Sequence, residues 1–235
     1  MTATGAKAAE IKLMCSGAMR PALEELAPQF ERASGHKLAI TYGSTNVIKE
    51  RALAGDAGDL VIFAGPAVED VVRQGKLAAK VDLVRSGVGV GVPAGAPRPD
   101  LSSSEAFKRT LLAAKSFARS EGPSGTYIAA LLERMGIAEQ MKGKTVVVRG
   151  RLVGDALVKG EAEIGVQQVS ELKSVPGVDV LPMPAEIQHI TVFSAGLTPQ
   201  AKASEAVQAF IKYLTSPSAA PVIKAKGLEP VISNQ

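Results

Sequence analysis

Ser124-Gly125-Thr126-Tyr127 is a turn of small and hydroxyl-bearing residues that stands directly in front of a helical pattern. Two earlier segments are built in the same way. Cys15-Ser16-Gly17-Ala18 follows the apolar run 11–14, and Gly43-Ser44-Thr45-Asn46 follows the run 38–42. Each turn leaves the first N–H groups of its helix without an intrahelical partner and places a hydroxyl oxygen beside the positive end of the helix dipole. One such turn is an ordinary helix cap, whereas all of them together would form an uncharged cage for an anion.

The length and composition of the chain predict a globular protein with a full hydrophobic core. With 235 residues and 46% hydrophobic content, the chain can form one large domain or two lobes of about 100 residues each. The net charge is +4, but lysine and arginine are scattered and form no basic run. Aromatic residues make up 4% and tryptophan is absent, which argues against stacking platforms for bases. We therefore expect no nucleic-acid partner.

Residues that commonly hold metals or form disulfides are scarce. Cys15 is the single cysteine, which excludes an intrachain disulfide, and His36 and His189 are the two histidines. We expect no metal site and no other cofactor. A cysteine at a strand end, with no histidine placed beside it by the sequence, is typical of a small buried residue rather than a nucleophile.

The sequence bears on the compartment through its apolar runs and its first residues. No apolar run reaches the roughly 18 to 20 residues that span a bilayer, so we expect no membrane-spanning segment. Residues 1–9 are small and weakly polar and lack the apolar core of a secretory signal. This opening fits a mature periplasmic protein and equally a cytoplasmic one.

Strand and helix patterns alternate along the chain. In the first part, strands are expected at 10–14, 37–42 and 59–63, with a helix after each. In the middle part, strands are expected at 115–118, 145–148 and 163–166, again separated by helices. The first helix has apolar residues at spacings of three and four, which predicts one buried face: Leu23, Leu26, Ala27, Phe30 and Ala33. The alternation predicts an α/β fold with mostly parallel sheets flanked by helices.

The pattern changes where valine and glycine alternate over residues 84–93. A nucleotide-binding loop is excluded there, because Pro93 and Pro97 follow instead of the helix that such a loop must open. We expect an extended segment that crosses from one lobe to the next, and a second crossing near 190–196. The predicted lobes are residues 1–86 with 194–235 and residues 87–193, with hinges at about 84–92 and 190–196. Two lobes with two crossings can close around a ligand.

In the order of its segments the chain resembles the type II periplasmic solute-binding proteins of ABC transporters, and among them it is most similar to the molybdate-binding branch. The resemblance covers about 11–227. It is carried by the order of the following segments: Cys15-Ser16-Gly17-Ala18-Met19, Tyr42-Gly43-Ser44-Thr45, Gly58-Asp59-Leu60, Pro123-Ser124-Gly125-Thr126-Tyr127, and Gly160-Glu161-Ala162-Glu163-Ile164-Gly165-Val166. The fold that it implies is a two-lobed one.

The resemblance also implies a ligand site made of hydroxyls and backbone amides that hold an oxyanion. Matched segment by segment, the expected ligand-binding residues are Ser16, Gly17, Ser44, Thr45, Ser124, Gly125, Arg151, Val153, Gln167 and Gln168. The family usually has alanine where Ser124 stands, and tyrosine in the segment that holds Gln167 and Gln168. A carboxamide accepts as well as donates and has a different reach from a tyrosine hydroxyl, which favours another anion over molybdate.

Arg149 and Arg151 bracket the turn before Val153. A guanidinium matches a carboxylate with two parallel hydrogen bonds, so these arginines favour an organic anion with several carboxylates. The alternative is a pair of solvated arginines on a surface turn.

Two classes of function remain open. The first is a monomeric binding protein that captures a small anion and delivers it to an ABC permease. The second is an isomerase of a small tricarboxylate in the same cleft, because the resemblance extends to aconitate isomerase. That reaction needs a base, and Glu121 or His189 is the speculative candidate.

Overall fold

The computed structural model describes residues 8–202 and 204–231. All but the last two residues of the leader at 1–9 therefore lie outside the described residues. The chain divides into two compact units. Unit 1 takes its described residues from Met1–Leu83, Phe193–Lys224 and Pro230–Gln235, and unit 2 comprises Val84–Val192 and Ala225–Glu229. The segments expected as hinges lie within the strands β4 (Ala79–Pro93) and β9 (Ile190–Leu197), which run through both units. Their role as hinges stays a prediction.

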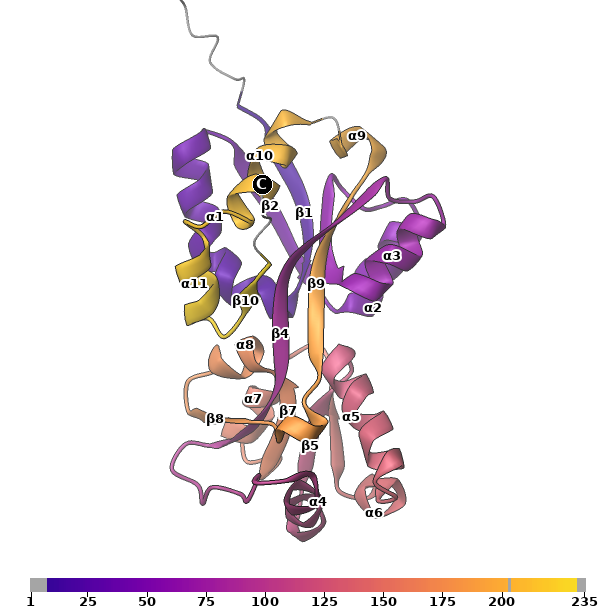
Figure 1. The fold of residues 1–235 in the computed structure, drawn as a ribbon, viewed down its shortest axis with the longest axis vertical. Coiled ribbons are helices and arrows are strands. Elements are labelled where there is room, and N and C mark those ends of the chain that lie inside the picture. The colour runs from indigo at the N-terminus through magenta and orange to yellow at the C-terminus, as the bar shows by residue number, and fades with distance from the viewer. Residues whose placement is uncertain (1–7, 203, 232–235) are drawn as a thin grey trace, which may run out of the picture. The chain divides into compact units, whose positions relative to one another are not determined.

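Unit 1 is built on a sheet with the strand order β2-β1-β3-β9. Strand β1 is parallel to β2 and β3, and β9 is antiparallel to β3. Figure 1 shows helices α2 and α3 on one side of this sheet and α1 and α10 on the other. The elements of unit 1 besides β4 and β9 are β1 (Glu10–Ser16), η1 (Gly17–Met19), α1 (Arg20–Ser34), β2 (Lys37–Gly43), α2 (Thr45–Leu53), β3 (Leu60–Ala64), α3 (Gly65–Arg73), α9 (Pro199–Lys202), α10 (Glu205–Leu214) and α11 (Ala220–Ala225), whose last residue groups with unit 2.

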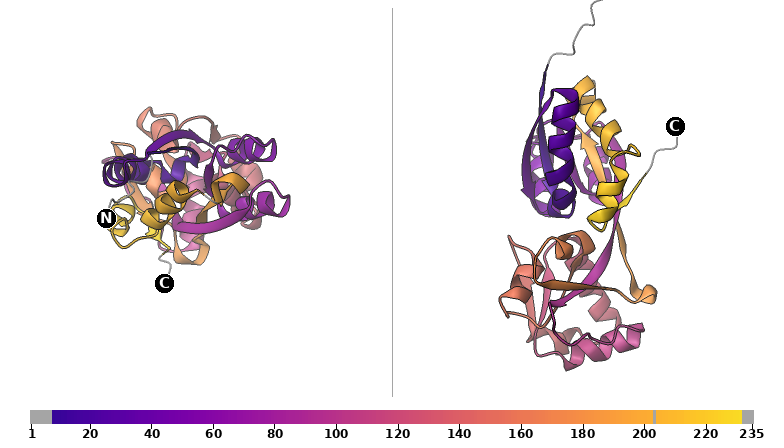
Figure 2. Two further views of the ribbon diagram at one scale, coloured as in Figure 1. Left: turned by 90° about the horizontal axis from the view of Figure 1, so that it is seen from above. Right: turned by 90° about the vertical axis from the view of Figure 1, so that its left-hand side faces the viewer.

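Helix α1 carries the apolar face that the spacing predicts. Leu23, Leu26, Ala27 and Phe30 are buried, and Phe30 packs on Phe210 of α10 with ring centroids 4.9 Å apart. The right-hand view of Figure 2 shows α1 beside the C-terminal helices. The prediction for Ala33 is wrong. This residue is exposed, since it lies in the last turn of a helix that ends at Ser34.

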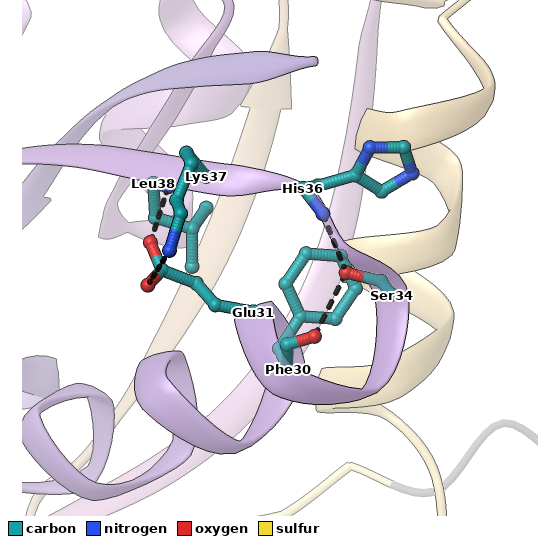
Figure 3. A network of polar contacts seen from close by, with 6 residues as sticks. All are labelled: Phe30, Glu31, Ser34, His36, Lys37 and Leu38. Carbon is teal, nitrogen blue, oxygen red and sulfur yellow. Dashed lines mark hydrogen bonds and ion pairs between the residues drawn. The ribbon is translucent and has the colours of Figure 1, made fainter. Parts of the chain in front are cut away.

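A network of polar contacts joins the end of α1 to the start of β2 (Figure 3). Glu31 accepts from the N–H of Leu38 at 2.8 Å and from Lys37 Nζ at 3.3 Å, and these contacts lower the pKa of its carboxyl. Ser34 Oγ donates to the carbonyl of Phe30 at 2.8 Å. The network holds the chain at the tight turn between α1 and β2.

Unit 2 is built on a sheet with the strand order β4-β7-β5-β6. Strands β7, β5 and β6 are parallel, β4 is antiparallel to β7, and β8 adds to β4 in antiparallel fashion. The elements are α4 (Ser104–Ala113), β5 (Phe117–Ser120), α5 (Pro123–Arg134), α6 (Ala138–Lys142), β6 (Thr145–Val148), α7 (Val153–Val158), β7 (Ile164–Gln168), α8 (Val169–Lys173), β8 (Val178–Pro182) and η2 (Ala185–Ile187), and the short β10 (Glu229–Pro230) ends the region at the boundary with unit 1.

Each face of the unit 2 sheet has its own hydrophobic cluster. One cluster includes Phe117 of β5 and Ile128 of α5, and the other includes Ala118 of β5 and Leu157 of α7. Successive side chains of a strand point to opposite faces, so α5 and α7 cover opposite sides of β5. No helix in the described part of the chain has both the length and the apolar character that crossing a bilayer requires.

Helix α5 begins unusually close to the end of β5. A Cβ atom added at Gly125 would lie 1.7 Å from the carbonyl oxygen of Ser120. That oxygen belongs to the backbone and cannot move away alone. Gly125 is therefore required by close approach of the first turn of α5 to β5.

We expect Gly125→Ala to destabilise the protein by about 1–3 kcal/mol or more, because the added methyl group overlaps the backbone of β5. Gly143→Ala is the matched control in the same unit. Gly143 has φ −73° and open space around its Cβ position, so alanine should be neutral or slightly stabilising there. Urea unfolding followed by circular dichroism measures both. Equal midpoints for the two variants would contradict the required close approach.

Candidate functional site

In unit 1 the predicted residues meet at one edge of the sheet. Parallel pairing sets Ser16 opposite Gly43, so β1 and β2 end side by side. The turn after β1 opens η1, and the turn after β2 opens α2. Ser16, Gly17, Ser44 and Thr45 therefore gather at the carboxyl ends of neighbouring strands, which is where α/β sheets bind ligands.

The two serines of unit 1 are arranged differently. Ser44 is the N-cap of α2, and its Oγ accepts from the N–H of Val47 at 3.3 Å. Ser16 is only 4% exposed and precedes η1, yet its hydroxyl forms no capping hydrogen bond there. Ser44 is thus a helix cap, whereas the hydroxyl of Ser16 is free of that task.

Thr45 occupies the first position of α2. It is 8% exposed, and its Oγ1 has no hydrogen-bond partner among the described residues. A buried hydroxyl without a partner costs about 1–3 kcal/mol relative to one that is hydrogen-bonded. This hydroxyl lies beside the unsatisfied N–H groups at the start of a nine-residue helix. The first turn of α2 therefore offers donors that the protein itself does not use.

Cys15 precedes this edge and is fully buried. Burial raises the pKa of its thiol well above the ordinary value, so the sulfur stays protonated at neutral pH. Its Sγ donates to the carbonyl of Ser16 at 3.4 Å. A protonated, buried thiol is a packing residue rather than a nucleophile.

In unit 2, Ser124 and Gly125 form the first turn of α5 against the end of β5. Ser124 is 1% exposed, and its Oγ lies 3.2 Å from Oγ of Ser120. The N-cap of α5 is Gly122, which has no side chain to satisfy the first N–H groups. Two hydroxyls and the open start of a helix thus lie together at the carboxyl end of β5.

The predicted amide donor Val153 is already engaged. Its N–H donates to Gln167 Oε1 at 2.7 Å, and both residues are buried. The Gln167 side chain also hydrogen bonds to the carboxyl group of Glu171. Gln167 therefore links the start of α7 to α8, and a ligand would have to compete with its carbonyl oxygen for the N–H of Val153.

Gln168 ties strands of unit 2 together. With its amide nitrogen toward Ser86, the side chain donates to Ser86 Oγ at 2.9 Å and accepts from Thr191 Oγ1 at 3.1 Å. Gln168 is 1% exposed. Successive residues of β7 point to opposite faces of the sheet, so the side chains of Gln167 and Gln168 lie in different surroundings. The amide of Gln168 holds β7 to β4 and β9.

The two arginines of the predicted pair face different acids. Arg149 Nε lies 3.6 Å from Glu121 Oε2, and the Arg149 side chain is 71% exposed. Arg151 pairs with Glu161 through Nη2, while its Nη1 is buried without a partner among the described residues. This pairing lowers the pKa of the Glu161 carboxyl. The guanidinium of Arg151 is largely neutralised by Glu161.

The two bases suggested by the sequence have defined surroundings. Glu121 faces Arg149, as described above. His189 stacks on the ring of Tyr127 with centroids 4.4 Å apart, and burial together with the charge of Arg134 lowers the pKa of its imidazole. His189 is therefore neutral at pH 7.

Sequence reasoning missed three polar residues near these positions. Burial raises the pKa of Glu171 to about 7, although hydrogen bonds from Gln167 and the N–H of Gln168 oppose that shift. Ser120 contributes a hydroxyl beside Ser124, and Arg119 precedes it on β5. The signal for Ser120 was its place at a strand end, whereas the environment of Glu171 depends on packing that no local pattern reports. Among the described residues, no group of three or more His, Cys, Asp or Glu side chains is placed to hold a metal ion.

Comparison with known proteins gives a match over nearly the whole chain. Residues 11–229 match the family model described as bacterial extracellular solute-binding protein. Among curated proteins, the chain is 36% identical to aconitate isomerase of Pseudomonas sp. over 94% of this chain and 88% of that protein. It is 25% identical to the molybdate-binding protein ModA of Azotobacter vinelandii, over 97% of this chain and 92% of that protein.

Solved structures show the same architecture. The periplasmic molybdate-binding protein of Azotobacter vinelandii superposes with a TM-score of 0.75 at 20% identity, covering 93% of this chain and 98% of that chain. The sulfate-binding protein SubI of Mycobacterium tuberculosis has a TM-score of 0.74 at 19% identity, covering 95% of this chain and 87% of that chain. These likenesses confirm the expected two-lobed α/β fold. The chain belongs to the family of bacterial extracellular solute-binding proteins.

Proposed function

We propose that this chain binds a small organic anion with more than one carboxylate, and that donors of unit 1 and donors of unit 2 hold the same anion. The observation that carries the proposal is Thr45, whose buried Oγ1 has no partner among the described residues and lies at the start of α2. Neighbouring Ser16 adds a second hydroxyl at the same edge of the sheet. An anion there would satisfy hydroxyl and amide donors together.

Unit 2 supplies the complementary donors. Ser120 and Ser124 have their hydroxyls 3.2 Å apart, and the first N–H groups of α5 are open beside them. These donors carry no formal charge. They suit a carboxylate and an oxyanion equally, so they support the class of ligand but do not select within it.

The comparisons favour a polycarboxylate within that class. The protein that is 36% identical to this chain is named for aconitate, a tricarboxylate, and the proteins named for molybdate are 25% identical. The replacement of the family's tyrosine by Gln167 and Gln168 points the same way. We also propose a periplasmic location and delivery to an ABC permease, which family membership supports. The proposal further includes a monomeric state and closure about the hinges near 84–92 and 190–196.

A second candidate function is isomerisation of a small tricarboxylate, favoured by the similarity to aconitate isomerase. A base would take a proton from the carbon next to the double bond, the electron pair would shift along the chain, and a proton would return at the other end. No oxidant or cofactor is needed. The hydroxyls and amides would stabilise the charge that develops on the carboxylate oxygens.

Glu171 has the pKa that such a base requires. A value of about 7 allows the carboxylate to form at neutral pH and still to accept a proton with a good driving force. Glu121 is tied to Arg149, and His189 is neutral and stacked on Tyr127. Glu171 is therefore a third candidate base, beside Glu121 and His189, which the sequence suggested.

For the binding function, we expect citrate, tricarballylate or an aconitate isomer to raise the thermal midpoint by several degrees. A ligand at a hundred times its Kd adds about 2.7 kcal/mol to the free energy of unfolding. Thermal-shift screening should compare these acids with molybdate, tungstate, sulfate and phosphate. A strong response to an oxometallate with none to any carboxylate would contradict the proposed ligand class.

For the unit 1 donors, Thr45→Val should weaken anion binding several-fold without lowering the stability of the free protein, because it removes an unpartnered hydroxyl. Ser44→Ala should weaken binding and also cost about 1 kcal/mol as a lost cap. Ser103→Ala is the matched control, since Ser103 caps α4 by accepting from Ala106 N–H at 3.1 Å. Calorimetric titration of all three variants with a carboxylate that binds the wild type measures the affinities. The thermal midpoints of the free variants measure the stabilities. Wild-type affinity in Thr45→Val would show that the hydroxyl plays no part in binding.

For the isomerase function, incubation of micromolar protein with cis-aconitate should yield the trans isomer. Proton NMR measures its formation. The rate should rise between about pH 6 and pH 8, because Glu171 loses its proton around pH 7. Glu171→Gln should abolish turnover and retain binding. Glu139→Gln, an exposed residue on α6, is the control. Absence of turnover by the wild-type protein would eliminate this candidate and leave the binding function intact.

A further inference from the structure

Arg119 lies at the junction between β5 and α5 in unit 2. It points to the same face of β5 as Phe117, which packs with Ile128 of α5. Its Nη1 is 3.4 Å from the carbonyl oxygens of Ser120 and Gly125. Both distances are long for hydrogen bonds to a guanidinium, so these contacts leave most of its donor capacity unused.

Arg149 is the first residue after β6, the strand that pairs with β5 beside Arg119. Parallel pairing sets Arg119 opposite Val147 and Ser120 opposite Val148, so Arg149 follows directly on the neighbouring strand. None of the ion pairs in the described residues involves Arg119. Arg149 pairs with one acid, Glu121, with 3.6 Å between Nε and Oε2. Two guanidinium groups and one carboxylate leave an excess of one positive charge at this edge.

The two cations act on each other. Burial, and then the charge of Arg149, lowers the pKa of the Arg119 guanidinium, although an arginine stays protonated in water. Like charges held close together are unfavourable unless an anion lies near them. A guanidinium is also the group that binds a carboxylate with two parallel hydrogen bonds.

We propose that Arg119 and Arg149 bind one carboxylate of the organic anion and thereby select polycarboxylates over inorganic oxyanions. This inference rests on the proposed binding function and assigns the specificity of its unit 2 half. The hydroxyls of Ser120 and Ser124 with the first N–H groups of α5 serve one charged group of the ligand, and the arginines serve another. A tetrahedral oxyanion has no second group for the arginines to hold.

Arg151 does not fill this role. Its guanidinium pairs with Glu161, so it brings no excess charge to the site. Arg119 therefore replaces Arg151 as the partner of Arg149 in carboxylate recognition. The sequence conceals this, because Arg119 and Arg149 are brought together only by the pairing of β5 with β6.

The test is calorimetric titration of four variants with tricarballylate, which cannot be isomerised, and with glutarate, which lacks its central carboxylate. Arg119→Ala and Arg149→Ala should each weaken tricarballylate binding about ten- to a hundredfold, the usual cost of a lost charge-assisted hydrogen bond. Arg119→Lys keeps the charge without the paired donors and should be intermediate. Arg109→Ala is the control, because Arg109 is exposed on α4 of the same unit and pairs loosely with Asp100 at 3.7 Å.

The difference between the two acids gives a second measure. In the wild type, tricarballylate should bind more tightly than glutarate, and in one or both alanine variants that difference should shrink, as in a double-mutant cycle between side chain and ligand carboxylate. Wild-type affinity for tricarballylate in both alanine variants would overturn the inference and leave the binding function standing. If the wild type binds neither acid, both proposals are wrong. The exposed position of Arg149 keeps the test valid even where Arg119→Ala loosens α5.

Discussion

Parallel strand pairing is the constraint on which both groups of donors depend. Because β1 and β2 run in register to Ser16 and Gly43, the turns that follow them emerge at the same edge of the sheet. The parallel strands β7, β5 and β6 do the same for unit 2. Each turn starts a helix whose first N–H groups have no partner within the helix, so the topology gathers hydrogen-bond donors there. Side chains of the protein take up some of them, such as the N–H of Val47 and the N–H of Val153. The backbone thus provides the N–H donors, and the side chains around them determine which anion is preferred.

The features that could be predicted from the sequence are those encoded over a few neighbouring residues. The spacing of Leu23, Leu26 and Phe30 marks the buried face of α1, and the structure confirms it. Periodicity did not show where that face ends, so Ala33 was wrongly included. The helix starts at Ser44 and Ser124 were recognisable for the same local reason, because small polar residues between a strand and a helix pattern are typical of helix starts. The expected turn in front of the second helix is wrong in its bounds, since α5 begins at Pro123 and Ser124 lies inside its first turn.

The surroundings of the site residues depend on contacts between distant segments, which no local pattern contains. Gln167 and Gln168 are adjacent in sequence, but they point to opposite faces of β7, and their partners come from different elements. Glu171 owes its raised pKa to burial, a property of the folded chain. The pairing of Arg151 with Glu161 joins residues on either side of α7. From the sequence, this arginine and Arg149 looked equivalent.

The distribution of charge explains how one scaffold can serve different anions. Hydroxyls and N–H groups stabilise any compact anion, and their donor strength changes little between a carboxylate and a tetrahedral oxyanion. A tricarboxylate differs in carrying its charges several bonds apart, so an uncharged cage stabilises only the carboxylate that it encloses. A cation at the rim then discriminates, because two unit charges 4 Å apart interact by about 4 kcal/mol at an effective dielectric constant near 20. In our proposal Arg119, which has no acid of its own among the described ion pairs, supplies that discrimination.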